Sequence, residues 1–171
     1  MPVPTQYVAS IAIDDCIDAL GAFLQPFLGG APIVRAQVNR VATPPGAFIK
    51  LTELLQVPLE TPSADYDGEN QQISLTGPKR IDIQVDFYGP SSGDQCAAIE
   101  TVYRTSYAAS QFPAGIAPLY CSNGNQTPLI TGEEQYASRW TLTASLQYNP
   151  AVVVPQQSAT ELTLHTLSPV A

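Results

Sequence analysis

The chain has 171 residues, of which 44% are apolar and only 13% charged, and its 15 Asp and Glu against 7 Lys and Arg give a net charge of −8. This length predicts one domain, residues 1–171, and ordinary apolarity with little charge argues against intrinsic disorder. Binding to DNA through phosphates is disfavoured because Lys79-Arg80 is the only adjacent basic pair, and no apolar run approaches the roughly 18 residues of a membrane span.

The N-terminal part predicts an extended arm, a helix and strands. Two early prolines indicate the arm over 1–8. From 10 to 28, apolar residues recur at spacings of three and four, which predicts a helix with Ser10 as its N-cap. The apolar stripe of this helix consists of Ile13, Ile17, Leu20 and Leu24. Alternation predicts a strand over 33–41, and 48–60 indicates one long strand or two short ones.

The middle of the chain contains the clearest strand. Residues 61–70 are polar and rich in turn formers, which predicts a projecting loop, and a short strand is expected over 71–76. Over 80–88, every second residue is apolar, which predicts a strand with one buried face and one face that is wet or covered by polar partners. The apolar positions are Ile81, Ile83, Val85 and Phe87.

The second half predicts one more helix and a long strand. Ser92 and Gln95 form a capping-box pattern, so a helix is expected over 93–110. Residues 114–132 predict a second projecting loop. Over 138–148 the alternation returns, and one face carries Trp140, Leu142, Ala144, Leu146 and Tyr148.

The C-terminal part ends in short extended pieces. Val152-Val153-Val154 lies between two prolines, and two interpretations stay open: an ordinary edge strand, or an arm that packs on a neighbouring subunit. A last strand is expected over 162–166. The order helix, strands, helix, strands, with short connections, predicts an α+β fold: a mixed, largely antiparallel β-sheet flanked by two main helices.

Residues that bind cofactors or metals form no complete pattern. The chain lacks the glycine motifs that bind nucleotides, and its only histidine, His165, lies on the polar side of a predicted strand. Cys16, Cys96 and Cys121 have neither zinc-site spacing nor an even count for a disulfide framework, which predicts reduced thiols. We therefore expect no cofactor and no metal.

The acidic residues offer an enzymatic alternative. Residues 65–69 resemble the start of a calcium loop but lack Gly and Glu at the positions such a loop requires. Asp82 and Asp86 share one strand face, about 13 Å apart, which is too far for a glycosidase pair. Together with Glu133-Glu134 they define the alternative of a carboxylate-dependent hydrolase, which predicts a deep pocket holding two close acids.

Three blocks between residues 33 and 156 resemble motifs of phage neck terminator proteins. The first is Gln37-Val38-Asn39-Arg40-Val41 followed by Pro44-Pro45, and the second is Val85-Asp86-Phe87-Tyr88-Gly89-Pro90 with Ser92-Gly93-Asp94. The third runs over 129–136, Arg139-Trp140 and 147–156. The residues that this resemblance marks as structural are Gln37, Asn39, Arg40, Tyr88, Gly89, Gly132, Trp140, Tyr148, Asn149 and Pro150.

The resemblance implies a structural virion protein without catalytic residues, located at the neck, the head–tail junction, after assembly in the host cytoplasm. The implied partners are copies of itself in a ring, usually of six, the tail tube protein, and a neck/collar or head-completion protein. DNA would pass through the ring without sequence-specific binding. Within the structural class, a tail tube or baseplate subunit is the alternative.

Two surfaces are predicted to carry this role. If acids line the channel of a ring whose subunits each carry −8, the wall repels DNA. Asp65, Asp67 and Glu69, on the acidic loop expected to be most exposed, are therefore candidates for lumen or partner contact. The candidates for contact between subunits are Arg139, Val152, Val153 and Val154, and for Arg139 pairing with an acid across a strand of its own chain is the alternative.

Overall fold

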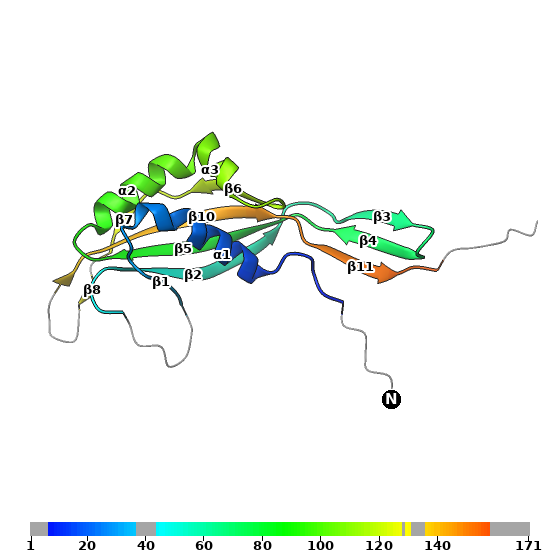
Figure 1. The fold of residues 1–171 in the computed structure, drawn as a ribbon, viewed down its shortest axis with the longest axis horizontal. Coiled ribbons are helices and arrows are strands. Elements are labelled where there is room, and N and C mark those ends of the chain that lie inside the picture. The colour runs from blue at the N-terminus through cyan, green and yellow to red at the C-terminus, as the bar shows by residue number, and fades with distance from the viewer. Residues whose placement is uncertain (1–6, 37–43, 128, 131–135, 158–171) are drawn as a thin grey trace, which may run out of the picture.

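The computed structural model describes residues 7–36, 44–127, 129–130 and 136–157, which form an elongated α+β structure (Figure 1). Its helices are α1 (Ile13–Leu24), the 3-10 helix η1 (Gln25–Phe27), α2 (Ser92–Tyr103) and α3 (Ser106–Gln111). Its strands are β1 (Ile33–Arg35), β2 (Phe48–Pro58), β3 (Ser63–Asp67), β4 (Gln72–Thr76), β5 (Lys79–Tyr88), β6 (Ile116–Cys121), β7 (Asn125–Gln126), β8 (Leu129–Ile130), β9 (Tyr136–Ala137), β10 (Arg139–Tyr148) and β11 (Ala151–Pro155).

The main sheet has the strand order β1-β2-β5-β10-β6. Strand β7 pairs with β10 on the same side as β6, but nearer the N-terminus of β10. The pair β1–β2 is parallel, and the other described pairs are antiparallel. The two strands with the clearest alternation in sequence, β5 and β10, are neighbours, with Val85 opposite Leu142. The predicted fold class, α+β with a mixed, largely antiparallel sheet, is confirmed.

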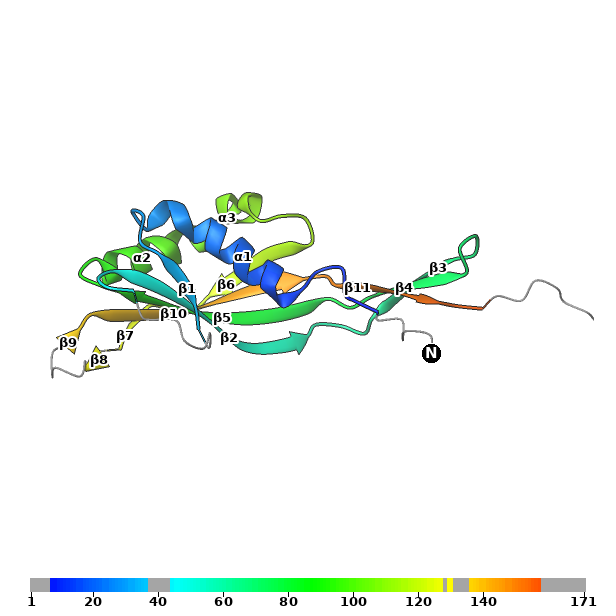
Figure 2. The ribbon, with the colours of Figure 1, turned by 60° about the horizontal axis from the view of Figure 1, so that its bottom comes forward.

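The helices cover one face of the main sheet, and the core lies between these two layers (Figure 2). We call the main sheet with its helices the body. Burial of one large apolar side chain stabilises the fold by roughly 1.5–3 kcal/mol, so this interface holds the body together. Its fully buried members include Leu20 and Leu24 of α1, Ile99 of α2, Ile81, Ile83, Val85 and Phe87 of β5, and Leu146 of β10.

Helix α1 begins at Ile13 with Ala12 as its N-cap, so the prediction that Ser10 caps it is wrong. The Asp15 carboxylate accepts a hydrogen bond from the Ala12 N–H at 2.7 Å. A side chain within the first turn thus binds the backbone N–H of the N-cap residue. Ser10 pairs with Ala151 instead. Its Oγ accepts from the Ala151 N–H at 3.0 Å, and its own N–H donates to the Ala151 carbonyl at 2.9 Å.

The helix predicted over 93–110 is two helices. Helix α2 ends at Tyr103 and α3 begins at Ser106. Thr105 separates them, because its N–H and its Oγ1 both donate to the Val102 carbonyl, at 3.0 and 2.7 Å. These bonds use up a carbonyl of the last turn and stop the helix.

The predicted capping box of this helix is also wrong. Ser91, not Ser92, is the N-cap, and Ser92 is buried within the first turn. The Oγ atoms of Ser92 and Ser138 are hydrogen-bonded at 2.8 Å, and the Gln95 amide donates to the Leu28 carbonyl at 3.5 Å. Both side chains, Ser92 and Gln95, therefore bind residues far away in sequence and do not cap the helix.

Both segments predicted as projecting loops contain strands. Within 61–70, β3 pairs with β4, so this segment is part of a hairpin. Within 114–132, β6 and β7 pair with β10. These strands owe their structure to their neighbours, since strand preference depends strongly on context.

The remaining predicted strands differ in how far the structure describes them. The segment 48–60 forms one long strand, β2, with a bulge between Glu53 and Leu55. Of the strand predicted over 33–41, the structure shows β1, and positions 37–43 lie outside the described residues. The strand predicted over 162–166 and positions 1–6 of the N-terminal arm lie outside them as well.

A second sheet of three strands, in the order β11-β4-β3, extends from one end of the body (Figure 1), and we call it the arm. Its strands continue three adjacent strands of the main sheet: β2 leads into β3, β4 into β5, and β10 into β11. Each connection contains a proline: Pro62, Pro78 and Pro150. Because proline has no N–H to donate, the ladder of the main sheet stops there and the arm is a separate sheet.

Candidate assembly surface

The arm has one apolar and one polar face. Ala64 lies opposite Leu75, and Leu75 opposite Val152. Residues that lie directly opposite in antiparallel strands share a face. The apolar face of the arm therefore consists of Ala64, Tyr66, Ile73, Leu75, Val152 and Val154. The other face carries Ser63, Asp65, Asp67, Gln72, Ser74 and Thr76 of β3 and β4, together with Ala151, Val153 and Pro155 of β11.

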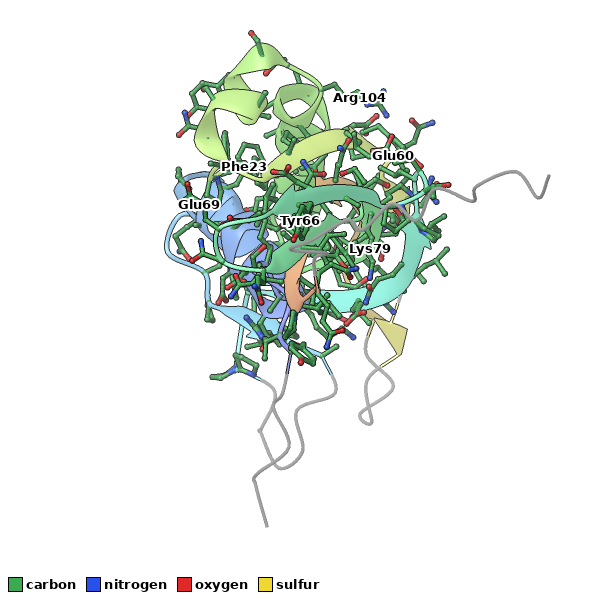
Figure 3. All side chains as sticks on the ribbon, turned by 90° about the vertical axis from the view of Figure 1, so that its right-hand side faces the viewer. Phe23, Glu60, Tyr66, Glu69, Lys79 and Arg104 are labelled. Atoms are coloured by element: carbon green, nitrogen blue, oxygen red, sulfur yellow. The ribbon has the colours of Figure 1, made fainter. Side chains whose placement is uncertain are left out.

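The apolar face of the arm is partly open to solvent: Ala64, Tyr66 and Leu75 are exposed, and Ile73, Val152 and Val154 are half-buried. Tyr66 is 44% exposed and Leu75 is 36% exposed. Figures 1 and 2 show the arm extending past the three helices, and Figure 3 looks onto its end, with Tyr66 labelled. A contiguous apolar patch of this kind is typical of a surface that another protein covers.

The acidic residues predicted for lumen or partner contact lie on the outer part of the arm. Asp65 and Asp67 are on the polar face, and Glu69 lies in the turn between β3 and β4. All three are exposed, and the described ion pairs involve none of them. Residues 59–78 contain four acids and no Lys or Arg, so the arm carries negative charge without a local counterion.

Asp67 fixes the turn at the end of the arm. Its carboxylate accepts hydrogen bonds from the Asn70 side-chain amide at 2.6 Å and from the N–H groups of Glu69 and Asn70 at 3.0 and 3.2 Å. These bonds, the one from the Asn70 side chain above all, hold the pKa of Asp67 below its usual value. The turn thus presents an ionised Asp67 beside Glu69.

The sheet face that the helices leave uncovered carries an ionic cluster around Asp86, which is fully buried. Arg139 donates to its Oδ1 from two nitrogens, at 2.9 and 3.2 Å, and the Lys50 Nζ lies 3.5 Å from Oδ2. Thr141 and Gln84 donate to the same carboxylate at 2.7 and 2.9 Å. Arg139, predicted as a contact between subunits, thus makes an ion pair across β5 and β10 within its own chain.

One residue marked by the family resemblance, Tyr88, lies beside this cluster, whereas Trp140 and Tyr148 lie on the opposite, core-facing side of the sheet. The Tyr88 ring stacks on Phe48 at 4.3 Å between ring centres, and the cations of Lys50 and Arg139 each lie 5.7 Å from its centre. Trp140 packs against the core, partly buried, and the Tyr148 hydroxyl donates to Gln56 at 2.8 Å.

Other marked residues lie at chain turns. Asn149 and Pro150 form the step from β10 into the arm, where the Pro150 carbonyl accepts from the Gly77 N–H at 3.2 Å. Gly89 follows β5 with a φ of +115°. Gln37, Asn39, Arg40 and Gly132 lie outside the described residues.

The described residues do not form the pocket that a carboxylate-dependent hydrolase requires. Asp82 accepts from Ser145 at 2.6 Å and pairs with Arg80, while Asp86 lies in its own cluster. Glu133-Glu134 lie outside the described residues. Asp15 and Asp18 line an open groove of about 510 Å³, but both are exposed, and they bind the Ala12 N–H and Arg35.

The three cysteines are buried, and none forms a disulfide. Burial raises the pKa of the Cys16 and Cys96 thiols to about 11, so both are neutral at physiological pH. Within the described residues, no cluster of three or more His, Cys, Asp or Glu is arranged to hold a metal ion. No helix in that part of the chain is long and apolar enough to span a membrane.

Sequence reasoning missed the two faces of the arm. A strand was expected over 71–76, where β4 forms, but the prolines and turn formers around Ala64 and Tyr66 indicated a loop, although these two residues also alternate with polar ones. It also treated Val152, Val153 and Val154 as one unit. The pairing with β4 separates them, because Val153 points to the polar face.

An α+β body with a projecting amphipathic sheet is typical of a subunit that assembles with other proteins. Residues 14–168 match the family model described as phage neck terminator protein, and the chain belongs to that family. It is therefore a structural component of the phage virion at the neck end of the tail, with a tail-terminator role, and not an enzyme. The family resemblance noted in the sequence is confirmed.

Solved structures support the fold. The sheath/tube terminator of an extracellular contractile injection system, PVC, in its extended state, is similar with a TM-score of 0.51 and 10% identity, over 96% of this chain and 67% of that one. At this identity the likeness shows a shared fold. A second solved chain, 24% identical over 85% of this chain and 98% of its own, has a TM-score of 0.30, too low to indicate one. No curated protein matches the chain.

Proposed function

We propose that the chain forms a ring of six copies at the head–tail interface, where it caps the tail tube, joins it to the neck and lets DNA pass through a central channel. The terminator role follows from the family. In a ring, every copy contacts its two neighbours through the same two surfaces, and the assembly closes on itself.

The observation that carries the passage of DNA is the acidic arm. Asp65, Asp67 and Glu69 are exposed and lack a paired cation among the described residues. In a ring, these charges repeat with each subunit and are part of the net charge of −8 per chain. Such a field repels phosphates, so the genome slides without sequence-specific binding.

The partners of this ring are the tail tube protein on one side and a neck/collar or head-completion protein on the other, joined in the host cytoplasm. A low share of charged residues, 13%, supports extensive contact with neighbours, since interface cores are depleted in charge. The outer edges of β6 and of the arm strand β3 have no described strand partner and offer further backbone contacts.

Negative-stain imaging of the purified protein, alone and mixed with tail tubes, tests the proposal. Rings with a hole wide enough for duplex DNA, or single rings on tube ends, are the expected result. Continuous stacking into tubes would instead support a tail tube subunit. A monomer that neither associates nor binds a tube end would contradict the ring.

Reversal of charge at Asp65, Asp67 and Glu69 to lysine is expected to slow genome ejection or to reduce the yield of joined particles, because the channel wall would then attract phosphates. Particle yield and the rate of DNA release measure this effect. The control is the neutral set Asp65→Asn, Asp67→Asn and Glu69→Gln, which keeps side-chain shape and is expected to show a smaller effect. Normal yield and infectivity of the lysine variant would count against a lumen or partner role.

A further inference from the structure

The strand edges of this fold differ in how many backbone groups they leave open. At the outer edge of β11, Ser10 binds both the N–H and the C=O of Ala151. Strand β6 contains Pro118, which has no N–H, and its Cys121 carbonyl accepts a hydrogen bond from Arg104 at 2.8 Å. Such features limit the pairing of an edge with a further strand.

The outer edge of β3 carries no such protection. At the end of β4, the Gly77 N–H donates to the Pro150 carbonyl on the β11 side, at 3.2 Å. Because the backbone groups of successive residues point to opposite sides of a strand, even-numbered residues of β4 bond to β3, and the odd-numbered residues of β3 bond back to them. The N–H and C=O groups of Ala64 and Tyr66 therefore point away from β4, and no described hydrogen bond uses them.

The side chains of β3 define which strand could pair with this edge. An added strand would meet Ala64 and Tyr66 on one face and Asp65 and Asp67 on the other. Opposite charges on neighbouring strands stabilise a sheet, and like charges destabilise it. The edge therefore selects a strand in which Lys or Arg alternates with apolar residues.

This chain does not contain such a strand. Nowhere in the sequence do two Lys or Arg residues stand two positions apart. Residues 158–171, which follow the arm in sequence, contain one acid, Glu161, and no Lys or Arg. The β3 strand of a second copy would bring aspartates beside Asp65 and Asp67, which repel one another. The opposite charge must therefore come from another protein.

We infer that the outer edge of β3 takes up an extended strand of a partner protein, in which Lys or Arg alternates with apolar residues. This strand bonds to the N–H and C=O groups of Ala64 and Tyr66 and becomes the fourth strand of the arm. Its cations lie beside Asp65 and Asp67. The inference rests on the proposed joining role and gives these two acids contact with a partner, while Glu69 and the other acids of the chain repel DNA.

A short synthetic peptide of alternating Lys and Val, added to the protein, tests the edge directly. Amide hydrogen exchange, measured by NMR, should slow at least tenfold at Ala64 and Tyr66, whose N–H groups the peptide binds. It should change little at Asp65, whose N–H already faces β4. The control peptide, with Glu in place of Lys, should leave the exchange at all three positions unchanged.

Substitutions in β3 extend this test to the assembled particle. Ala64→Pro removes one outward N–H and leaves the bonds from β3 to β4 in place, since proline is tolerated at a strand edge. It is expected to abolish the protection at Tyr66 and to lower the yield of joined particles, whereas the matched control Ala64→Val keeps the N–H and should behave as wild type. Asp65→Lys should also abolish protection by the Lys peptide. Exchange at Asp67 in each variant checks that β3 still pairs with β4.

The outcomes separate the edge assignment from the ring. Equal protection by the Lys and Glu peptides, no protection by either, or a normal yield of joined particles with Ala64→Pro would overturn the assignment and leave the ring standing. Protein that binds the Lys peptide but never forms rings would support the edge and refute the ring alone.

Exchange in the protein without peptide tests whether the chain covers this edge itself. If the amides of Ala64 and Tyr66 are already slow there, the assignment to another protein is overturned. Protection that rises with protein concentration would then identify a second copy, and protection independent of concentration would identify residues 158–171. Fast exchange of both amides at every concentration is the expected result.

Discussion

Replacement of Asp86 by alanine is expected to lower the free energy of unfolding by about 3–5 kcal/mol, which makes it one of the most damaging single changes in the chain. The carboxylate is fully buried and binds Arg139 and Lys50. Without it, the two cations face each other across β5, and the Thr141 hydroxyl loses its acceptor at 2.7 Å. Urea unfolding at fixed protein concentration, followed by circular dichroism, measures the loss.

The control for this variant is Asp14→Asn on α1. Asp14 is also bound to an arginine, Arg35, at 2.7 Å, but its side chain is 75% exposed. An exposed ion pair contributes about 0–1 kcal/mol, so this change should be nearly neutral. Equal losses for the two variants would show that burial of Asp86 does not set the strength of its cluster.

Gly89→Ala is expected to destabilise the fold by about 3–5 kcal/mol, from backbone strain and overpacking together. Gly89 has a φ of +115°, a conformation that alanine rarely adopts. An added Cβ would lie 2.7 Å from the Ala47 Cβ and 3.0 Å from the Ala47 Cα, and the backbone atom cannot move aside alone. The midpoint of urea unfolding, with the slope unchanged, reports this loss.

Gly46→Ala separates the two causes. Gly46 also has a positive φ, +82°, but nothing lies within 4 Å of its added Cβ. Its substitution should cost only the strain of the backbone, about 1–2 kcal/mol. A Gly89→Ala variant no less stable than Gly46→Ala would mean that the contact with Ala47 relaxes freely.

Strands with strong alternation were predictable because one local pattern decides them. Over 80–88 and 138–148, period 2 identified the strands and the faces that are buried in the structure. The spacing of apolar residues likewise predicted helix α1, although its start was placed too early. The apolar face of such a strand or helix is buried whichever element covers it, so the face can be predicted without knowing the rest of the fold.

Side chains with two possible partners were not predictable in this way. Ser10 and Ser92 both suit a local cap, and both bind residues far away in sequence, Ala151 and Ser138. The energies of a cap and of a tertiary hydrogen bond are similar, about 1 kcal/mol each, so only the packed structure selects between them.

The sequence by itself determined the α+β class, the acidic character, the core faces of the two longest strands and, through its motifs, the family. The tertiary structure decided what lies beside what: Asp86 with Arg139, three prolines at one junction, and Val152 and Val154 on the same face as Leu75 and Ile73. The physical reason is that residue order fixes alternation along one strand, whereas register between strands sets which side chains share a face and which of them remain uncovered.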